Sequence, residues 1–289
     1  MSEAWQTSAH VDWFKNTGQT LKTNDGKDVE VWEFQHQPDN KVLSAWAKHF
    51  RNHYCLDNEI DVRRGKRTRQ DFLNVMKFPS ETSNLGPPIR AGDFGEILVA
   101  DFLEWILGFT VPRIRWSDKV IQDESPKGSD VIGFKLYDNE EFSPEDILLV
   151  IETKTKFSKT KNNRLQDAIN YSVKNSVRLG ESLNFIRQQF INKNRNEQIP
   201  LVDRFQSPAD IPYHQRYGAA AFISDEYYTD DEITLADCTK IPKLIDKKTK
   251  EIIEYIPHPY KNQLILFVFK GNAMMSLVHE LYRRAADEA

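Results

Sequence analysis

The sequence is poor in cysteine and has no long apolar run. Only two cysteines, Cys55 and Cys238, occur among its 289 residues. This number fits a reducing compartment and excludes a cysteine-rich zinc site. The apolar run over residues 264–269 is far too short to span a bilayer. No charged, apolar and small-residue signal opens the chain, so we expect a cytoplasmic protein without membrane association.

The phosphate-binding loop of nucleotide hydrolases is also missing. That loop needs G-x-x-x-x-G-K-[ST], and Gly65-Lys66-Arg67 lacks both the earlier glycine and the hydroxyl residue. We therefore expect any ATP-consuming step to belong to a partner. His49 and His53 are spaced for zinc on one helix face, but they lack the H-E-x-x-H glutamate, and Cys55 is the one evident third ligand. The pair does not predict a zinc site.

Positive charge is clustered, although the net charge is −4. Hydrophobic residues make up 39% and charged residues 28%, as in soluble globular proteins. The two basic clusters are predicted to contact nucleic-acid phosphates, with a solvated loop as the alternative. Their cations are Arg63, Arg64, Lys66, Arg67 and Arg69 in the first cluster, and Lys154, Lys156, Lys159 and Lys161 in the second.

Hydrophobic periodicity divides the chain into two parts. Residues 1–88 form a predicted N-terminal layer that contains a helix over residues 41–54 and ends in the polar, proline-containing segment 78–88. Residues 89–289 form a predicted α/β core. Because the layer looks separate from the core, we consider it a possible docking surface for a partner.

The core begins with a predicted helix at Asp93, where Glu96 three residues later completes a capping box, and Gly108 ends this helix. Three extended segments then predict an antiparallel meander, followed by a long helix and a buried strand. A peripheral hairpin, an apolar strand and a terminal helix complete the core. In chain order these segments are residues 110–116, 129–136, 147–154, a helix from about 163, 217–224, 243–255, 264–269 and a helix from about 272.

Charged residues emerge from the end of one core strand. In LLVIETKTK (residues 148–156), four apolar residues precede Glu152 and Lys154, which share one strand face, as does Lys156 if the strand continues. Asp130 begins the preceding strand and is expected beside Glu152, because successive strands usually become neighbours. Two such carboxylates suit Mg²⁺ (or Mn²⁺), which prefers oxygen ligands. The main-chain carbonyl of Thr153 is a further candidate ligand.

This arrangement resembles the restriction-endonuclease-like PD-(D/E)XK superfamily, whose core order is αβββαβ with a mixed central sheet flanked by helices. GDFGEILVADFLE at residues 92–104, followed by VP, GSD and IETK, is more narrowly similar to the HamA nuclease subunits of Hachiman anti-phage defence systems. The resemblance is carried by residues 92–178. Ser129 precedes Asp130 where the superfamily motif has proline.

The resemblance implies a magnesium-dependent deoxyribonuclease that acts as the effector of a defence complex with a HamB-like helicase. It implies that Asp130, Glu152 and Glu96 are metal ligands and that Lys154 is the catalytic lysine. Gln166, in the first turns of the next helix, matches an accessory glutamine of the superfamily.

Other interpretations remain open for each residue. Glu152 and Lys154 are alternatively a surface ion pair on an edge strand. Asp130 is alternatively a turn residue, Glu96 a capping residue and Gln166 an ordinary helix-surface residue. For the whole chain, the alternatives are a non-catalytic DNA-binding or docking subunit, and a nuclease of DNA repair or RNA processing.

Overall fold

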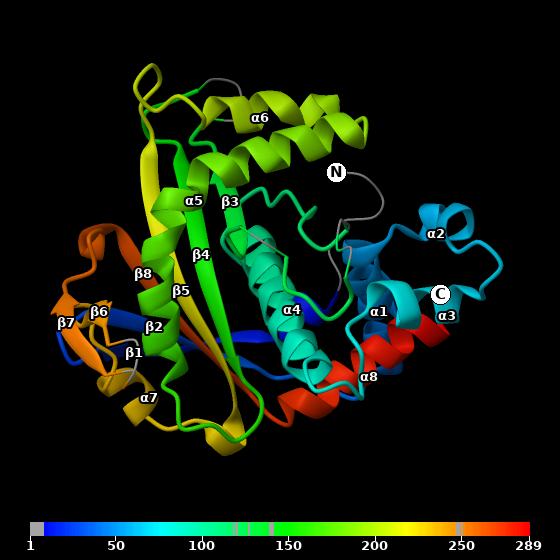
Figure 1. Ribbon diagram of the computed structural model, residues 1–289, viewed down its shortest axis with the longest axis horizontal. Coiled ribbons are helices and arrows are strands. Elements are labelled where there is room, and N and C mark those ends of the chain that lie inside the picture. The colour runs from blue at the N-terminus through cyan, green and yellow to red at the C-terminus, as the bar shows by residue number, and fades with distance from the viewer. Residues whose placement is uncertain are drawn as a thin grey trace.

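The computed structural model describes residues 9–117, 119, 121–126, 128–138, 142–246, 249 and 251–289. Its centre is a six-stranded sheet in the order β1-β2-β8-β5-β4-β3 (Figure 1). Strands β2, β8, β5 and β4 run parallel, and the edge strands β1 and β3 are antiparallel to their neighbours. The strands are β1 (Phe14–Lys22), β2 (Asp28–Phe34), β3 (Val131–Lys135), β4 (Ile147–Lys156), β5 (His214–Ser224) and β8 (Leu264–Gly271).

Helices cover both faces of the sheet, which confirms the prediction of a mixed α/β fold with a flanked central sheet. Helices α1, α4 and α8 pack with one face, and α5 packs with the other. The longer helices are α1 (Asn40–Tyr54), α4 (Gly86–Asp101), α5 (Arg164–Asn192) and α8 (Met274–Asp287). The shorter helices are η2 (Ala9–Trp13), α2 (Asp57–Arg63), α3 (Arg69–Phe72), η3 (Leu73–Lys77), η4 (Phe102–Ile106), η5 (Asn196–Gln198), α6 (Ile199–Arg204), η6 (Asp225–Tyr227), α7 (Asp231–Thr234) and η7 (Lys261–Gln263).

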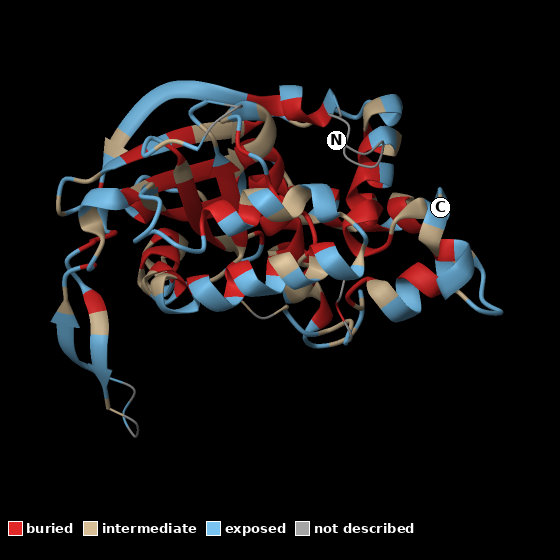
Figure 2. Ribbon diagram, turned by 90° about the horizontal axis from the view of Figure 1, so that it is seen from above, coloured by how far each residue is buried: buried red, intermediate tan, exposed pale blue. Residues whose placement is uncertain are grey.

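The central strands are apolar because both of their faces are covered. Strand β5 contributes Ala220 and Phe222 to the α4 and α8 side, and Ala219 and Ala221 to the α5 side. Such doubly covered parallel strands read as continuous apolar runs rather than as alternating ones. Figure 2 shows this buried centre. Within the described residues, no helix has the length and apolarity that a membrane crossing requires.

Helix α4 corrects the predicted helix start at Asp93. The helix begins at Gly86, and its first turn contains two prolines. Proline is compatible with that turn, because the first N–H groups of a helix have no partner within it. Asp93 and Glu96 therefore lie inside the helix and are buried, so the capping-box interpretation of Glu96 is wrong.

The predicted strand over residues 110–116 is also wrong. One bridge pairs Thr110 with Phe134, and the backbone leaves the extended conformation at Arg113, whose φ is +52°. Pro112 offers no N–H to a sheet. Residues 110–116 instead form an irregular connection. It places Arg113 beside Asp101 and Arg115 beside Glu96.

Residues 9–88 join the same sheet as the rest of the chain and do not form a layer beside it. Strand β2 pairs in parallel with β8, and Trp32 lies opposite Phe269. Helix α1 shares one apolar cluster with α4 and α8, and residue 88, the predicted boundary, lies inside α4. Residues 1–8 of the predicted layer lie outside the described residues, and its docking role stays a prediction.

The remaining predicted elements are confirmed. Helix α1 covers the predicted residues 41–54, α5 begins after its N-cap Asn163, and β8 and α8 follow at the expected places. The predicted hairpin consists of β6 (Ile241–Ile245) and β7 (Ile252–Ile256), which are antiparallel. Residues 247, 248 and 250 of that hairpin lie outside the described residues.

Candidate metal and active site

Asp130 and Glu152 meet where β3 and β4 pair. Their antiparallel register matches Val131 with Ile151, so one further step sets Asp130 opposite Glu152. Asp130 Oδ2 accepts a hydrogen bond of 3.0 Å from the backbone N–H of Thr153, and Glu152 is only 7% exposed. The structure thus brings together the two predicted carboxylates, whose roles stay predictions.

Lys154 lies on the same side of β4 as Glu152, as strand alternation predicts. Its Nζ is 2.5 Å from Glu152 Oε1 and 4.7 Å from the ring centroid of Tyr171 in α5. Lys174 approaches the same ring at 4.1 Å. The Lys154 ammonium is therefore held between a carboxylate and an aromatic face, and 24% of its side chain is exposed.

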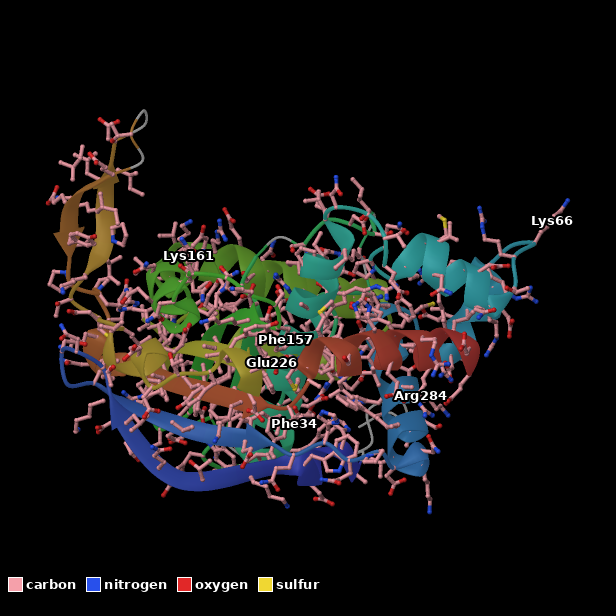
Figure 3. All side chains as sticks on the ribbon, turned by 90° about the horizontal axis from the view of Figure 1, so that it is seen from below. Phe34, Lys66, Phe157, Lys161, Glu226 and Arg284 are labelled. Carbon is pink, nitrogen blue, oxygen red and sulfur yellow. The ribbon has the colours of Figure 1, made fainter. Side chains whose placement is uncertain are left out.

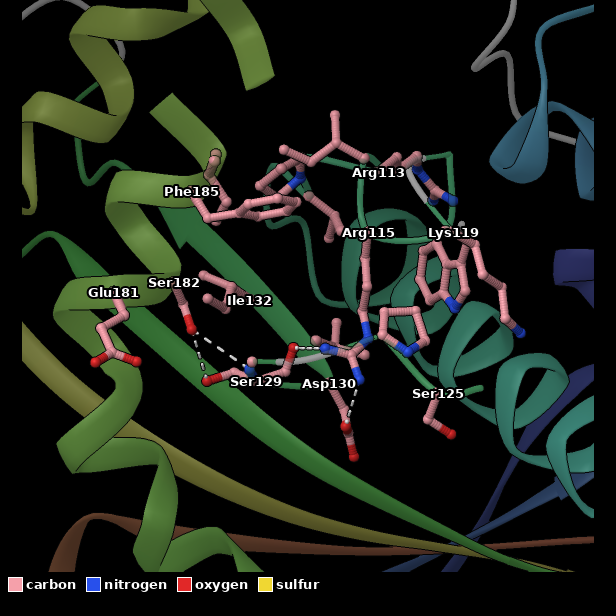
Figure 4. A pocket seen from close by; sticks show the side chains of 18 of the residues that line it. Arg113, Arg115, Lys119, Ser125, Ser129, Asp130, Ile132, Glu181, Ser182 and Phe185 are labelled. Atoms are coloured by element: carbon pink, nitrogen blue, oxygen red, sulfur yellow. Dashed lines mark hydrogen bonds and ion pairs between the residues drawn. The ribbon is translucent and has the colours of Figure 1, made fainter. Parts of the chain in front are cut away.

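Glu96 joins this group through an arginine that the sequence did not single out. Arg115 donates from Nε to Glu96 Oε2 at 3.0 Å and from Nη2 to Asp130 Oδ1 at 3.1 Å. Its Nη1 donates to the Ser129 carbonyl at 2.7 Å. Figure 4 shows this side chain reaching toward Asp130. Glu96, Asp130, Glu152, Lys154 and Arg115 form one group, which we call the carboxylate cluster.

The carboxylate cluster contains three acidic side chains and two cationic ones. Burial raises the pKa of Glu96 to about 8, and the nearby Asp130 adds to this although Arg115 opposes it. Burial and Asp130 likewise raise the pKa of Glu152 to about 7. Burial opposes the charge of Lys154, yet Asp130 and Glu152 raise its pKa overall. Lys154 is thus protonated at neutral pH, and the cluster favours a further positive charge.

The donor set fits a hard divalent cation. Glu96, Asp130 and Glu152 offer carboxylate oxygens, which Mg²⁺ and Mn²⁺ prefer over nitrogen or sulfur. The side chain of Thr153 faces α4, where it lies close to Gly95. The Thr153 carbonyl, 3.4 Å from Lys154 Nζ, is therefore the atom with which this residue would contribute.

Gln166 is committed elsewhere. Its Oε1 accepts from the Asp237 backbone N–H at 2.6 Å, and its Nε2 donates to Asn170 Oδ1 at 2.8 Å and to the Asp237 carbonyl at 3.3 Å. Both ends of the amide thus tie α5 to the segment after α7. This arrangement favours the interpretation of Gln166 as a structural residue, and its catalytic role stays a prediction.

The predicted nucleic-acid contacts lie in two separate places. Lys66 lies at one end of the molecule, and Lys161 lies over its other half (Figure 3). In the first cluster, Arg64 and Arg69 both pair with Asp61, and Arg63 pairs with Glu59. The exposed residues are Arg63, Lys66, Arg67, Lys159 and Lys161. These residues have the solvent access that phosphate contacts require.

Lys156 is less available than its sequence position suggests. Its Nζ lies 2.7 Å from Glu232 Oε2, and only 11% of its side chain is exposed. Glu232 also accepts from the backbone N–H of Arg164. Lys156 therefore helps to hold the start of α5 against α7, and its contact with nucleic acid stays a prediction.

A second buried polar group surrounds Asp101, the last residue of α4. His49, His53 and Asp101 offer ligand atoms within 4.8 Å of one another. However, Arg113 Nη1 already donates to Asp101 Oδ1 at 2.6 Å and lies 2.8 Å from His53 Nε2. His10 is 2.9 Å from the other Asp101 oxygen, and burial lowers the pKa of His10 to about 4. The guanidinium of Arg113 thus lies among these ligand atoms, and the third ligand atom comes from Asp101, which the sequence did not single out.

Comparison with known proteins gives one family. The model of the HamA family matches residues 9–285. No curated protein matches the chain. The matched range includes β1 and β2 as well as the carboxylate cluster, so the family match covers the whole sheet.

Proposed function

The chain belongs to the HamA family, and hence to the components of Hachiman defence systems; from this we propose that it is a metal-dependent deoxyribonuclease, the effector of a defence complex. The observation that carries the proposal is the convergence of Asp130, Glu152 and Lys154 at the β3–β4 junction, with Glu96 joined through Arg115. Three buried acids with two cations, Lys154 and Arg115, leave one negative charge uncompensated when all are ionised, which is costly unless a further cation binds there.

The order of elements supports a restriction-endonuclease-like core. Helix α4 is followed by the antiparallel pair β3 and β4, then by α5 and β5, which is parallel to β4. The chain departs from the expected order at residues 110–116, where the first strand of the meander is replaced by a connection with one bridge. We propose that the loss of the strand at residues 110–116 allows the connection to place Arg115 beside Glu96 and Asp130.

In the proposed mechanism, Glu96, Asp130, Glu152 and the Thr153 carbonyl would hold the cation. When bound, Mg²⁺ would supply an activated water and neutralise charge that develops on the phosphate. Lys154, kept protonated by Glu152 and Asp130, donates a hydrogen bond to the attacking water or to a phosphate oxygen as charge builds up there. Burial of the cluster strengthens each of these interactions, because bulk water screens them less.

We further propose a helicase as partner. The resemblance to HamA subunits implies this partner. The chain itself has no nucleotide-binding loop, so any ATP-driven movement along DNA would need another subunit. Co-purification with the product of a neighbouring helicase gene would test this proposal directly.

The proposed activity is tested with supercoiled plasmid DNA, using the purified chain and its complex with that helicase. We expect nicking or linearisation with Mg²⁺ or Mn²⁺ and none with EDTA. Cleavage that resists EDTA would contradict the metal mechanism. Intact DNA in both preparations, with Mn²⁺ bound, would favour a docking subunit, and cleavage of RNA in place of DNA would favour RNA processing.

Cation affinity is expected to rise with pH. The pKa values of Glu96 and Glu152, about 8 and 7, mean that both carboxyls largely carry a proton at pH 6.5 and largely lose it by pH 8.5. A protonated carboxyl does not bind a cation, so Mn²⁺ affinity should increase by at least about tenfold across this window. Calorimetry in two buffers of different ionisation enthalpy measures both the affinity and the protons released. An affinity that does not change with pH would contradict the prediction.

A further inference from the structure

Arg115 engages the carboxylates that the proposed cation needs. It donates to Glu96 Oε2 at 3.0 Å and to Asp130 Oδ1 at 3.1 Å. The other oxygen of Asp130 accepts from the Thr153 backbone N–H, so both Asp130 oxygens are in use. The three side chains are buried, with 13% of Arg115 and 10% each of Glu96 and Asp130 exposed. In such surroundings charge interactions are strong.

A divalent cation and this guanidinium repel each other at such a short range. Mg²⁺ binds oxygen at about 2.1 Å and keeps an octahedral shell of ligands and waters. A cation on Asp130 Oδ1 would therefore stand within a few ångströms of the Arg115 charge. Sharing the oxygen through its second lone pair leaves this repulsion in place, so the guanidinium has to withdraw from Asp130.

A cavity of about 470 Å³ lies next to Arg115 and offers the room to withdraw. Arg115 and Asp130 both line it, and so do Glu124 and Glu181, the latter on α5 (Figure 4). Arg113, Lys119 and apolar side chains line the same cavity, so a guanidinium that turns into this space gains room among charges of both signs. The segment that carries Arg115 is joined to the sheet by the Thr110–Phe134 bridge, so no paired strand has to break when the side chain moves.

We propose that Arg115 is a built-in competitor of the divalent cation: its guanidinium must release Glu96 and Asp130, turning into the adjoining cavity, when a cation binds there. The proposal rests on the metal site of the proposed function. It assigns to Arg115 a role that neither the family match nor the E-T-K motif contains. On this proposal, the Arg115 side chain lowers the affinity of the chain for the cation.

Calorimetry with Mn²⁺ at pH 8.5 tests this role on the full chain. Arg115→Met keeps the length of the side chain and removes the competing charge, so its affinity should exceed that of the unaltered protein by at least about tenfold. Arg187→Met is the matched control, because Arg187 pairs with Asp203 in an exposed ion pair; its affinity should not change. Equal or weaker binding by Arg115→Met overturns the competitor role and leaves the metal site standing. If none of the three proteins binds Mn²⁺, the metal site itself is overturned, and the competitor role with it.

A second measurement uses the unaltered side chain, in case Arg115→Met does not fold. The ¹⁵N resonance of the Arg115 Nε–H group, assigned by its loss in Arg115→Lys, reports the bond to Glu96. As Mg²⁺ saturates the protein, we expect this resonance to shift and its exchange with water to speed up by at least about tenfold. A resonance that stays unchanged while Mg²⁺ binds would show that Arg115 and the cation coexist, which overturns the proposal.

Discussion

Replacing Glu152 by alanine is expected to reduce Mg²⁺-dependent cleavage of plasmid DNA by at least about a thousandfold, and Lys154→Ala by about a hundredfold to a thousandfold. Glu152 supplies one of the proposed ligand carboxylates, so its loss weakens the cation site itself. Lys154 supplies charge where the transition state becomes negative, and one such donor contributes about this much in other hydrolases. Initial rates of plasmid nicking, with each variant at matched concentration, measure both effects.

Lys174→Ala is the control for this comparison. Lys174 lies over the same Tyr171 ring as Lys154, at 4.1 Å from its centroid, and it is not one of the residues of the carboxylate cluster. Its removal should leave the rate within about twofold, since an exposed cation–π contact contributes little. Equal cutting by the unaltered protein, Glu152→Ala and Lys154→Ala would rule out the assignment of the cluster. Melting temperatures of all variants separate loss of chemistry from loss of fold.

The same comparison is made in the helicase complex. If the proposed partner restrains cleavage, absolute rates will differ between the free chain and the complex. The ratio between variant and unaltered protein should not differ, because the proposed roles of Glu152 as a cation ligand and of Lys154 as a hydrogen-bond donor are the same in both settings. A ratio near one in both preparations would contradict the prediction more strongly than either result alone.

The part of the site that the sequence predicts comes from one short local pattern. Four apolar residues before Glu152 require a buried strand, and alternation then fixes Glu152 and Lys154 on one face. Asp130 follows from the antiparallel register, because the connection between β3 and β4 is short enough to make them neighbours. The hydrogen bond from the Thr153 N–H to Asp130 shows that the two strand ends lie side by side, as that register predicts.

Arg115 could not be found in this way. Its segment alternates apolar and charged residues like a strand, and the feature that breaks the strand is a positive φ at Arg113, which few non-glycine residues adopt. That conformation is stabilised by the buried contacts of Arg113 with Asp101 and Glu104, which lie in a different element. The one available signal was two arginines in an otherwise apolar stretch.

The error at α4 has a different cause. Asp93 and Glu96 have the spacing of a capping box, but Asp93 Oδ2 accepts from Lys119 at 2.6 Å and from Tyr54 at 2.8 Å. Asp93, and Glu96 through Arg115, thus make tertiary contacts from the middle of a helix. The two prolines in the first turn of α4 belong to a helix start, although the pattern of polar residues around them suggested a linker.

The pairing of the N-terminal strands is the part of the fold that local sequence patterns could not predict. Strand β2 pairs with β8, and its partner Phe269 is separated from Trp32 by most of the chain. Nothing in the periodicity of residues 28–34 identifies that partner, since any exposed parallel edge of suitable hydrophobicity would accept it. For this reason a segment that completes the sheet looked like a separate layer.

Asp101→Ala is expected to produce the largest loss of stability, about 3–5 kcal/mol in the free energy of unfolding. Asp101 is fully buried and accepts from Arg113, His49 and His10 at 2.6–2.9 Å. Burial opposes its charge, but His49 and Arg113 hold its pKa well below the ordinary value. Removing the carboxylate leaves the buried Arg113 without its ion pair to Asp101, although its bond to Glu104 stays. For a chain of 289 residues the loss corresponds to a fall in melting temperature of roughly 5–8 °C.

Asp203→Ala is the matched control, because its ion pair with Arg187 is 44% exposed on the Asp203 side and exposed pairs contribute about 0–1 kcal/mol. Thermal unfolding followed by circular dichroism compares the two variants. A melting temperature of Asp101→Ala within about 2 °C of the unaltered protein would contradict the prediction. The folded fraction of Asp101→Ala should still bind Mn²⁺, because the carboxylate cluster is intact. If that fraction instead lost Mn²⁺ binding while Asp130→Asn kept it, the cation would belong at the histidine group, with Arg113 as the side chain that has to move.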